Sequence, residues 1–392
     1  MRRSILSGAL FSLICIVPGA SAAAPASNPN EPNSPEFKRA TDLIHQLGSG
    51  RFSVREAAAK QLLEMGRSAR GALQVGQHDP DPEVADRCRR LLPQAAYADF
   101  QVRLDAFLAD KDGKQKHDLP GWDRFQKLMG KDKEGRELFA EMLKSNSELF
   151  VGLEIDPKSF PEKYAAHCQE LSAAMFAPKL GGVRTQPKPA ELATVFFLGT
   201  EPDSARAIRN NQMVGNLLWQ PAFQNTIRNG PAAEPFKKLF LAWMEQRTDV
   251  NSVSQCLAMV QQLNIKEGVD FAARVMKNKE MQVYVRAQAA TVLGKMGGKE
   301  HITPLEGLLD DDTQVGNFNM NGQLCITQMR DVALAMIIHL SGQKPQEFGF
   351  EFLKNQSNTV FSYPYLGFAD DKERSAARTK WKEWAASHKE KK

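Results

Sequence analysis

The sequence predicts an all-α fold, an α-α superhelix in which helices stack as a solenoid, with one short β-hairpin inserted. Apolar residues recur at helical spacing along most of the chain, and a short pattern of apolar, basic and small residues returns four times. Strand-like alternation is visible only within residues 313–327. The 392 residues, 42% hydrophobic and 25% charged, have the composition of an ordinary folded protein, which excludes a disordered or multi-span membrane chain.

The first residues have the pattern of a secretory signal peptide. Arg2 and Arg3 precede an apolar run over residues 5–17, and Ala20-Ser21-Ala22 supplies small residues for cleavage. The run is too short for a membrane-spanning helix, which needs about 18 or more apolar residues. We therefore expect residues 1–22 to be a signal peptide and 23–35 a flexible linker. The protein is expected in the periplasm, in the cell envelope or outside the cell.

Helix signals begin directly after this linker. Ser53 and Glu56 form a capping-box pattern at the start of the second predicted helix. Asp81 and Pro82 are suited to the N-cap and first position of the third, and Pro93 is expected to end it. These three helices are predicted over residues 37–47, 54–65 and 82–92.

A repeated pattern relates two of these helices to two later ones. It reads apolar residue, arginine, two variable residues, small residue, three variable residues, apolar residue. The four copies are Val54-Arg55 with Ala58 and Leu62, Val84-Ala85 with Cys88 and Leu92, Val285-Arg286 with Ala289 and Leu293, and Met329-Arg330 with Ala333 and Ile337. The pattern resembles HEAT repeats over residues 36–93 and 280–341, although Ala85 replaces the arginine in the second copy. The resemblance implies two-helix units that stack into a curved solenoid. We expect Arg55, Arg286 and Arg330 to be structural, each bonding to the neighbouring turn at a unit junction.

Three further segments are similar to stretches found in exported bacterial HEAT-like proteins of unknown role. This second resemblance covers most of the chain after the signal peptide. It implies a fold and an exported location, and it carries no catalytic residues. The segments are Leu119-Pro120-Gly121-Trp122, residues 328–334 with 339–342, and residues 367–371.

The rest of the chain is predicted to be helical but less regular. Residues 178–189 contain three prolines and two glycines and are predicted to link an N-terminal region, 36–177, to a C-terminal array, 190–371. Asn321-Gly322, between two apolar runs, predicts the hairpin turn. Residues 372–392 are expected to form a basic terminal helix. Residues 119–122 open a helical run that includes Phe125, Leu128 and Met129, and a further apolar stripe lies within 138–143. The other predicted helices are 97–108, 164–176, 190–198, 204–218, 234–246 and 252–263.

Charge and cysteine content exclude some classes of function. Without residues 1–22 the chain has 49 Lys and Arg against 46 Asp and Glu, a net charge of +3. Residues 372–392 alone carry +5, so the body is nearly neutral and lacks the basic face that nucleic-acid binding needs. The four remaining cysteines, Cys88, Cys168, Cys256 and Cys325, lie on apolar helical stripes. This placement favours buried free thiols over disulfides, and leaves their pairing open.

No catalytic, cofactor-binding or metal-ligating residue is predicted. The sequence contains no G-x-S-x-G motif, no phosphate-binding glycine loop and no pair of histidines one helical turn apart. The acidic run 310–312 invites comparison with a calcium loop, but Val315 and Asn321 occupy the positions where an EF-hand needs glycine and glutamate. A solvated helix end is the favoured interpretation.

The basic tail and the absence of reactive motifs together lead to the functional expectation. Trp381 and Trp384 share one face of the terminal helix and could contact a partner; a solenoid cap is favoured there over contact with a membrane surface. We expect a non-catalytic scaffold that binds a protein or a cell-envelope component. Two alternatives stay open: a hydrolase-like envelope enzyme with its site in residues 94–190, and attachment to a membrane surface through residues 372–392. The oligomeric state is also open.

Overall fold

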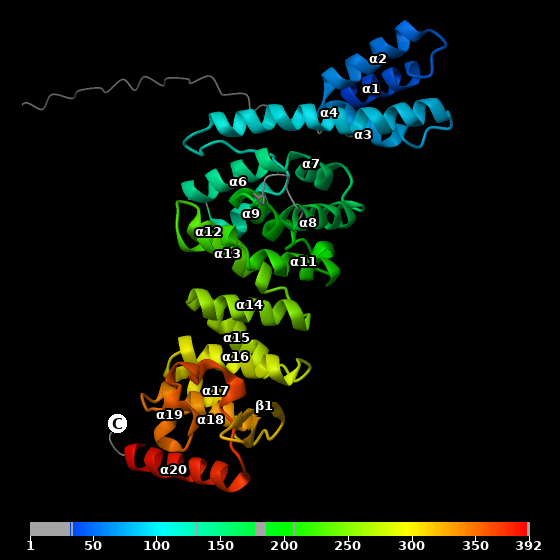
Figure 1. The fold of residues 1–392 in the computed structure, drawn as a ribbon. Helices are drawn as coiled ribbons and strands as arrows, with labels where there is room; N and C mark the ends of the chain where they lie inside the picture. The colour runs from blue at the N-terminus through cyan, green and yellow to red at the C-terminus, as the bar shows by residue number, and fades with distance from the viewer. Residues whose placement is uncertain (1–31, 33, 131, 177–185, 207, 390–392) are drawn as a thin grey trace, which may run out of the picture. The chain divides into compact units, whose positions relative to one another are not determined.

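The computed structural model describes residues 32, 34–130, 132–176, 186–206 and 208–389. These residues are predominantly helical, with a single two-stranded sheet, so the all-α prediction with an inserted hairpin is confirmed (Figure 1). The predicted signal peptide and most of the predicted linker 23–35 lie outside the described residues. The chain divides into two compact units between Asp99 and Phe100. That division differs from the predicted boundary at 178–189, of which residues 178–185 are not described.

Unit 1 contains α1 (Pro35–Gln46), α2 (Phe52–Met65), α3 (Arg67–Gly76) and the beginning of α4 (Pro82–Ala109). Helix α1 packs against α2 and α3 around a core of small and branched residues. Helix α2 begins at Phe52, and its N-cap is Arg51 rather than Ser53, so the predicted capping box is wrong. The turn is closed instead by Ser49, whose hydroxyl accepts from the Arg51 amide and whose carbonyl accepts from Arg55.

Helix α4 is longer than predicted. Asp81 Oδ1 accepts from the Glu83 amide at 2.9 Å, as expected of a helix start. Pro93 does not end the helix but lies inside it, and the predicted helix 97–108 is its continuation. An internal proline costs about 3 kcal/mol through its missing hydrogen bond. Burial of an apolar face on both sides of it, including Leu91 and Ala95, offsets that cost.

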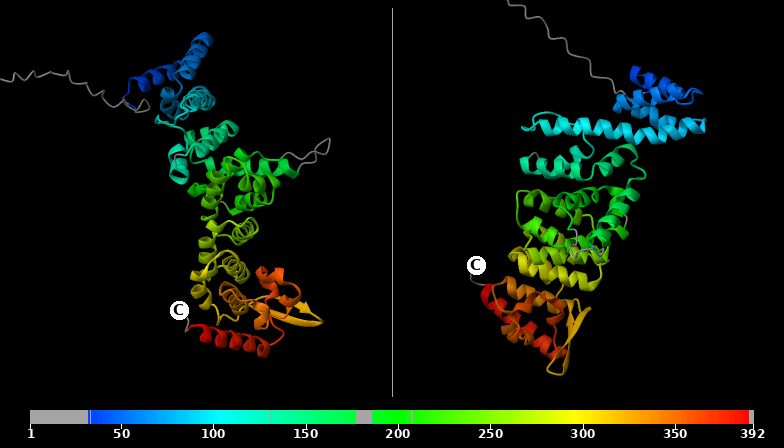
Figure 2. Two further views of the ribbon diagram at one scale, coloured as in Figure 1. Left: turned by 90° about the vertical axis from the view of Figure 1, so that its left-hand side faces the viewer. Right: turned by 45° about the horizontal axis from the view of Figure 1, so that its top comes forward.

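Unit 2 holds the remaining elements, and successive helices contact one another within it. Helix α9 packs against α6 and α13, α11 against α8 and α14, and α16 against α14, α15 and α18 (Figure 2). The α-helices are α5 (Trp122–Met129), α6 (Lys133–Ser145), α7 (Ser147–Ile155), α8 (Phe160–Phe176), α9 (Pro189–Leu198), α10 (Pro202–Arg206), α11 (Ile208–Leu218), α12 (Pro221–Arg228), α13 (Ala233–Met244), α14 (Val250–Leu263), α15 (Val269–Lys277), α16 (Val283–Met296), α17 (Ile302–Glu306), α18 (Met329–Leu340), α19 (Phe352–Asn355) and α20 (Asp371–Lys389). The 3-10 helices are η1 (Lys266–Gly268), η2 (Lys299–His301), η3 (Pro345–Phe348), η4 (Ser357–Phe361) and η5 (Tyr363–Tyr365).

Helix α9 is the centre of the aromatic core of unit 2. Nearly all of its residues are buried, because it is apolar around its whole circumference. Phe197 packs edge-to-face on Phe125 of α5 at a centroid distance of 5.5 Å. Phe196 packs on Phe223 and Trp243 at 5.6 and 5.4 Å. Phe197 also packs edge-to-face on Phe139 of α6, so two adjacent phenylalanines connect α5 and α6 with α12 and α13.

The hairpin lies between α17 and α18. Strand β1 (Gln314–Met320) pairs antiparallel with β2 (Gln323–Gln328), with Met320 opposite Gln323. Asn321 and Gly322 both have positive φ, 53° and 85°, as a two-residue type I′ turn requires. The predicted turn is therefore confirmed. Ile326 of β2 also bridges Phe368, which fastens the hairpin to the segment before α20.

The repeated sequence pattern falls on α2, α4, α16 and α18. In each copy the small residue and the final apolar residue are buried: Ala58 and Leu62, Cys88 and Leu92, Ala289 and Leu293, Ala333 and Ile337. The pattern therefore marks equivalent buried positions in four helices.

Candidate functional site

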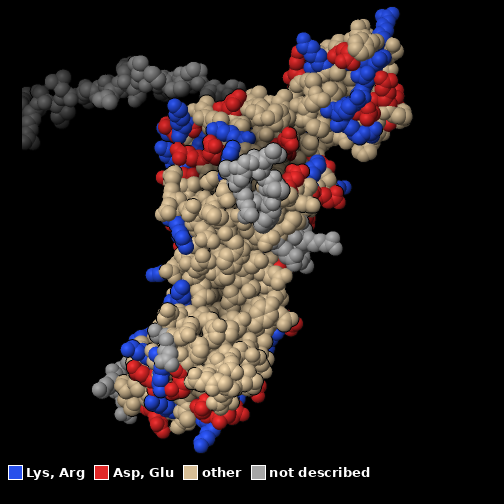
Figure 3. Space-filling model, in the orientation of Figure 1, with Lys and Arg blue, Asp and Glu red and all other residues tan. Residues whose placement is uncertain are grey.

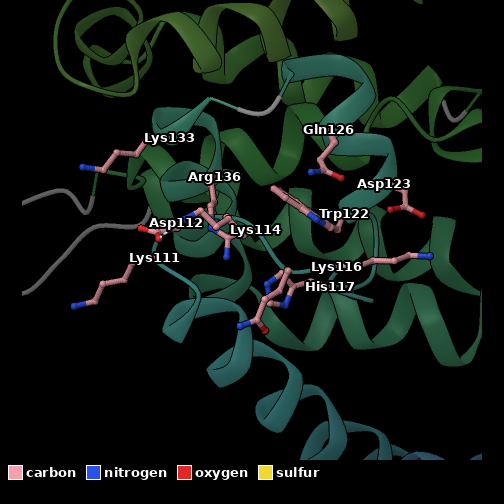
Figure 4. A pocket seen from close by; sticks show the side chains of 12 residues that line it. Lys111, Asp112, Lys114, Lys116, His117, Trp122, Asp123, Gln126, Lys133 and Arg136 are labelled. Atoms are coloured by element: carbon pink, nitrogen blue, oxygen red, sulfur yellow. Dashed lines mark hydrogen bonds and ion pairs between the residues drawn. The ribbon is translucent and has the colours of Figure 1, made fainter. Parts of the chain in front are cut away.

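A polar pocket of unit 2 lies beside the loop that joins α4 to α5. It has a volume of about 450 Å³ and is formed by this loop and the first turns of α5 and α6 (Figure 4). Its lining residues are Lys111, Asp112, Gly113, Lys114, Gln115, Lys116, His117, Trp122, Asp123, Gln126, Lys133 and Arg136. This set is called the basic pocket below.

Asp110 organises the loop from beneath the basic pocket. Its carboxylate accepts from the backbone amides of Lys114 and Gln115 at 3.2 and 3.1 Å. His117 Nε2 lies 2.8 Å from Asp110 Oδ2, and both side chains are buried. The hydrogen bond from His117 lowers the pKa of Asp110, and the two amides and Arg136 act in the same direction. An ionised Asp110 can only accept, so His117 carries its proton on Nε2.

Arg136 forms the floor of the basic pocket. Its Nη2 donates to the carbonyls of Phe107 and Asp110 at 2.6 and 2.9 Å, and lies 3.4 Å from the Asp110 carboxylate. The guanidinium also stacks 3.7 Å from the centre of the Phe107 ring. Phe107 in turn packs edge-to-face against His117 and Trp122. The floor is therefore rigid, because each of its polar groups is held by packing or hydrogen bonds.

Lysines surround this floor. In Figure 4 the side chains of Lys111, Lys116 and Lys133 extend outward, whereas Lys114 and Arg136 lie nearer the centre. Five cationic side chains line the pocket against two carboxylates, Asp112 and Asp123. On the face drawn in Figure 3, charged side chains also gather over α6 and α20, while the surface over α12 to α16 is mostly uncharged. The basic pocket thus concentrates positive charge on a nearly neutral body.

A second pocket of about 300 Å³ adjoins the first and shares His117 and Asp123 with it. Arg124 lines this pocket and pairs with Glu201 at 2.8 Å. Its guanidinium also lies 3.8 Å from the centre of the Phe197 ring and donates to the carbonyl of that residue. These contacts occupy the cation, so the second pocket offers less unpaired positive charge than the basic pocket.

The basic pocket is suited to binding anions. Lysine, arginine and amide side chains supply hydrogen-bond donors, whereas its lining contains no serine, threonine, cysteine or tyrosine that could act as a nucleophile. Within the described ranges, no three His, Cys, Asp or Glu side chains come together in a way that could hold a metal ion. Nor does that part of the chain contain a helix with the length and hydrophobicity needed to cross a membrane.

The three predicted repeat arginines lie at junctions between elements. Arg55 donates to the Ser49 carbonyl in the turn before α2 at 2.7 Å. Arg286, which is buried, donates to the Met276 carbonyl at the end of α15 at 3.0 Å and lies 3.3 Å from Asp311. These contacts join neighbouring elements as a structural role would require.

Arg330 makes a different set of contacts. It donates to the Gln328 side chain at 2.6 Å, and its Nη2 lies 3.4 Å from Asp371 at the start of α20. The structural role of the three arginines remains a prediction until stability is measured.

The two tryptophans of the terminal helix pack against the preceding segment. Trp381 is only 8% exposed, and its ring lies edge-to-face on Phe348 of η3 at 5.7 Å. Trp384 is half-buried, stacks on Trp381 at 5.0 Å and on His388 at 4.3 Å. The surface that α20 offers to a partner is therefore mostly the edge of Trp384 and the exposed lysines.

The acidic run 310–312 is engaged by arginines. Asp310 pairs with Arg378 of α20 at 2.6 Å, and Asp311 pairs with Arg286 and caps the Thr313 amide. The hydrogen bond from Arg378 lowers the pKa of Asp310. This run holds α16 and α20 to the loop before the hairpin.

Sequence reasoning missed the basic pocket. Residues 110–118 follow the predicted helix 97–108, and the sequence patterns gave no functional role to this stretch or to any of the seven histidines. The available signal was the density of charge in this stretch, four cationic or histidine side chains and three aspartates within nine residues.

Comparison with known protein families, curated proteins and solved structures found no match for this chain.

Proposed function

We propose that this protein is an exported, non-catalytic helical-repeat scaffold of the HEAT type that binds a protein or cell-envelope component. The observation that carries the proposal is the basic pocket, a group of cationic side chains around a fixed floor on a nearly neutral body. The floor of the pocket is held by hydrogen bonds and packing, whereas the exposed lysines around it supply the positive charge that would attract a partner. A partner that presents negative charge would complement this pocket.

The repeated helices support the scaffold part of the proposal. The small and final apolar positions of the pattern are buried in α2, α4, α16 and α18, and α16 packs directly on α18. Arg286 joins the end of α15 to the turn at Asp311. This is the kind of contact between neighbouring two-helix repeats that HEAT-like stacking needs. Stacked helical repeats of this kind create extended surfaces on which partners bind.

Capture of partners from an envelope extract tests the proposal. Lys111 and Lys116 are exposed and make no ion pair with the residues that the structure describes, so K111E/K116E reverses pocket charge without removing a structural contact. Lys277 and Lys279 are equally exposed lysines of unit 2 outside the pocket, and K277E/K279E is the matched control. The wild type and the control should enrich the same component by mass spectrometry, and K111E/K116E should lose it. No enriched component, or equal enrichment by all three proteins, would contradict the proposal.

One observation favours a second candidate function, a hydrolase-like envelope enzyme with its site in residues 94–190. Asp110 orients His117, and His117 lines both pockets in this region. A histidine held through Nε2 by a carboxylate could accept a proton from water at Nδ1. Turnover of ester or phosphoester substrates that is abolished in His117→Ala but kept in K277E/K279E would favour this enzyme over the scaffold.

A further inference from the structure

We infer that the basic pocket binds an organic phosphate that carries at least two negative charges. This inference rests on the proposed binding function and names the chemistry of the group that the pocket receives. Three properties of the pocket carry it: its charge, its size and the geometry of its donors.

The net positive charge of the lining residues indicates a ligand with more than one negative charge. The lining supplies five cations and two carboxylates, and the carboxylate of Asp110 beneath Arg136 adds a third negative charge, which leaves an excess of two positive charges. Lys114 pairs with Asp112 at 3.1 Å and Lys133 lies 3.7 Å from Glu137, but both lysines are about four-fifths exposed, so these pairs are weak. Lys111 and Lys116 have no ionic partner within the described part of the chain. A singly charged anion would leave one of these positive charges without a counter-charge.

The size of the pocket indicates an organic molecule rather than a bare ion. A volume of about 450 Å³ lies within the range of small-molecule sites and far exceeds one phosphate group. Trp122 lines the pocket but is only 5% exposed, so its ring offers little surface on which a ligand ring could stack. Gln115 and Gln126 instead offer amide groups to polar substituents. The ligand body is therefore expected to be polar.

The donor geometry favours phosphate over carboxylate. A guanidinium binds a planar carboxylate through two parallel hydrogen bonds, and both such forks include Nη2. In Arg136, Nη2 already donates to two carbonyls and faces Asp110. The other cations are lysines, which act as point charges and can approach a tetrahedral phosphate from several directions. The pocket is therefore better suited to surrounding a tetrahedral phosphate with lysines than to binding a planar carboxylate through a bidentate arginine.

Calorimetric titration of the purified protein with inorganic pyrophosphate, and with citrate as a polycarboxylate of similar charge, tests this inference. Pyrophosphate should bind, and citrate should bind about ten-fold more weakly or worse. K111E/K116E should weaken pyrophosphate binding by about ten-fold or more, since it reverses two charges beside the site, and K277E/K279E should leave it unchanged. Failure of pyrophosphate to bind, citrate binding of equal affinity, or an unchanged affinity in K111E/K116E would each overturn the inference.

Cosedimentation with vesicles identifies the source of the phosphate. Binding to phosphatidylcholine vesicles that contain phosphatidic acid, when it is displaced by pyrophosphate, supports a lipid headgroup as the ligand. Absence of vesicle binding together with tight pyrophosphate binding supports a soluble organic phosphate. Vesicle binding that survives both pyrophosphate and K111E/K116E excludes a lipid headgroup as the ligand of the pocket and favours a separate attachment through α20. If a captured partner is lost in K111E/K116E while no phosphate probe binds, this inference fails and the proposed function stands.

Discussion

The His117 imidazole donates from Nε2 to the buried carboxylate of Asp110 at 2.8 Å, and the same carboxylate holds two backbone amides of the loop between them. One acidic side chain thereby organises a loop that carries three lysines. The negative charge of Asp110 weakens the positive potential of the basic pocket above it. The same carboxylate fixes the backbone of the loop from which the pocket's lysines extend. Asp110 therefore lowers the positive potential of the pocket through its charge and fixes the loop through its hydrogen bonds.

Asp110→Asn is expected to lower the melting temperature and to speed hydrogen exchange at the Lys114 and Gln115 amides, because asparagine cannot accept from all four donors. Asp112→Asn, at an exposed position in the same loop, is the control and should change neither property. The pKa of Asp110 is lowered from 3.8, so its stabilising effect is present above about pH 4 and is lost as the pH falls through the native pKa. Equal behaviour of the two variants at neutral pH would contradict the organising role.

Arg286→Ala is expected to destabilise the protein more than Arg55→Ala or Arg330→Ala. Arg286 is buried and bonded to a carbonyl, so its removal should cost about 1–3 kcal/mol. The other two are more exposed, and their ion pairs should contribute about 1 kcal/mol or less. Urea denaturation measures all three, with exposed Lys277→Ala as the reference. Wild-type stability in all three arginine variants would refute the structural assignment.

Asp331 gives stability an unusual pH dependence. This carboxylate is buried, accepts from Arg374 Nε and the Gln328 amide, and burial raises its pKa to about 6. The native state therefore holds this proton more tightly than the unfolded state does. The contribution is complete below the ordinary pKa of 3.8 and is lost as the pH rises through about 6.

The Asp331→Asn variant isolates this contribution. Burial lowers the pKa of His167 and His339, and both histidines therefore favour stability at the higher pH, which opposes Asp331. The difference in unfolding free energy between wild type and variant removes those shared terms. It should change by about 2–3 kcal/mol between pH 4 and 7, with wild type gaining relative to the variant as the pH falls. A difference that does not vary with pH would show that Asp331 titrates normally.

The four thiols should be unreactive in the folded protein. Among the described residues, Cys88, Cys168, Cys256 and Cys325 are free and buried, as the sequence favoured, but Cys325 lies on strand β2 and not on a helical stripe as predicted. Burial raises the pKa of Cys88 to about 11 and of Cys168 to about 12, and raises those of Cys256 and Cys325 as well. Because the thiolate is the reactive form, a disulfide reagent such as Ellman's should modify them only after unfolding. Rapid reaction of any one under native conditions would show that its site opens locally.

Gly322→Ala should weaken the hairpin. Gly322 has φ 85°, and nothing lies within 4 Å of an added Cβ, so the cost comes from backbone strain alone. A loss of about 1 kcal/mol is expected in thermal unfolding. Gly307→Ala, at a right-handed helical residue with only ordinary contact around it, is the control and should be neutral. If both substitutions have the same effect, the turn conformation is not what stabilises the hairpin.

Local patterns predicted local structure well, and the departures have identifiable causes. The turn at Asn321-Gly322 was predictable because both residues tolerate positive φ. Pro93 was expected to end a helix, but the apolar face of α4 continues past it and outweighs the missing hydrogen bond. Ser53 matched a capping pattern, yet Ser49 and Arg55 close that turn instead. In both cases packing and side chains farther along the chain overrode a local preference.

Periodicity and turn chemistry are properties of neighbouring residues, so the sequence alone determined that this chain is helical, that it carries one hairpin and that its cysteines lie on apolar faces. The meeting of Asp110 with Arg136, 26 residues apart, and of Asp331 with Arg374, 43 residues apart, was decided only by the tertiary structure. Side chains so distant are brought together by how helices pack, and packing depends on the summed fit of many apolar contacts. The basic pocket was likewise decided by the tertiary structure, because its lining residues come from two helices and the loop before them.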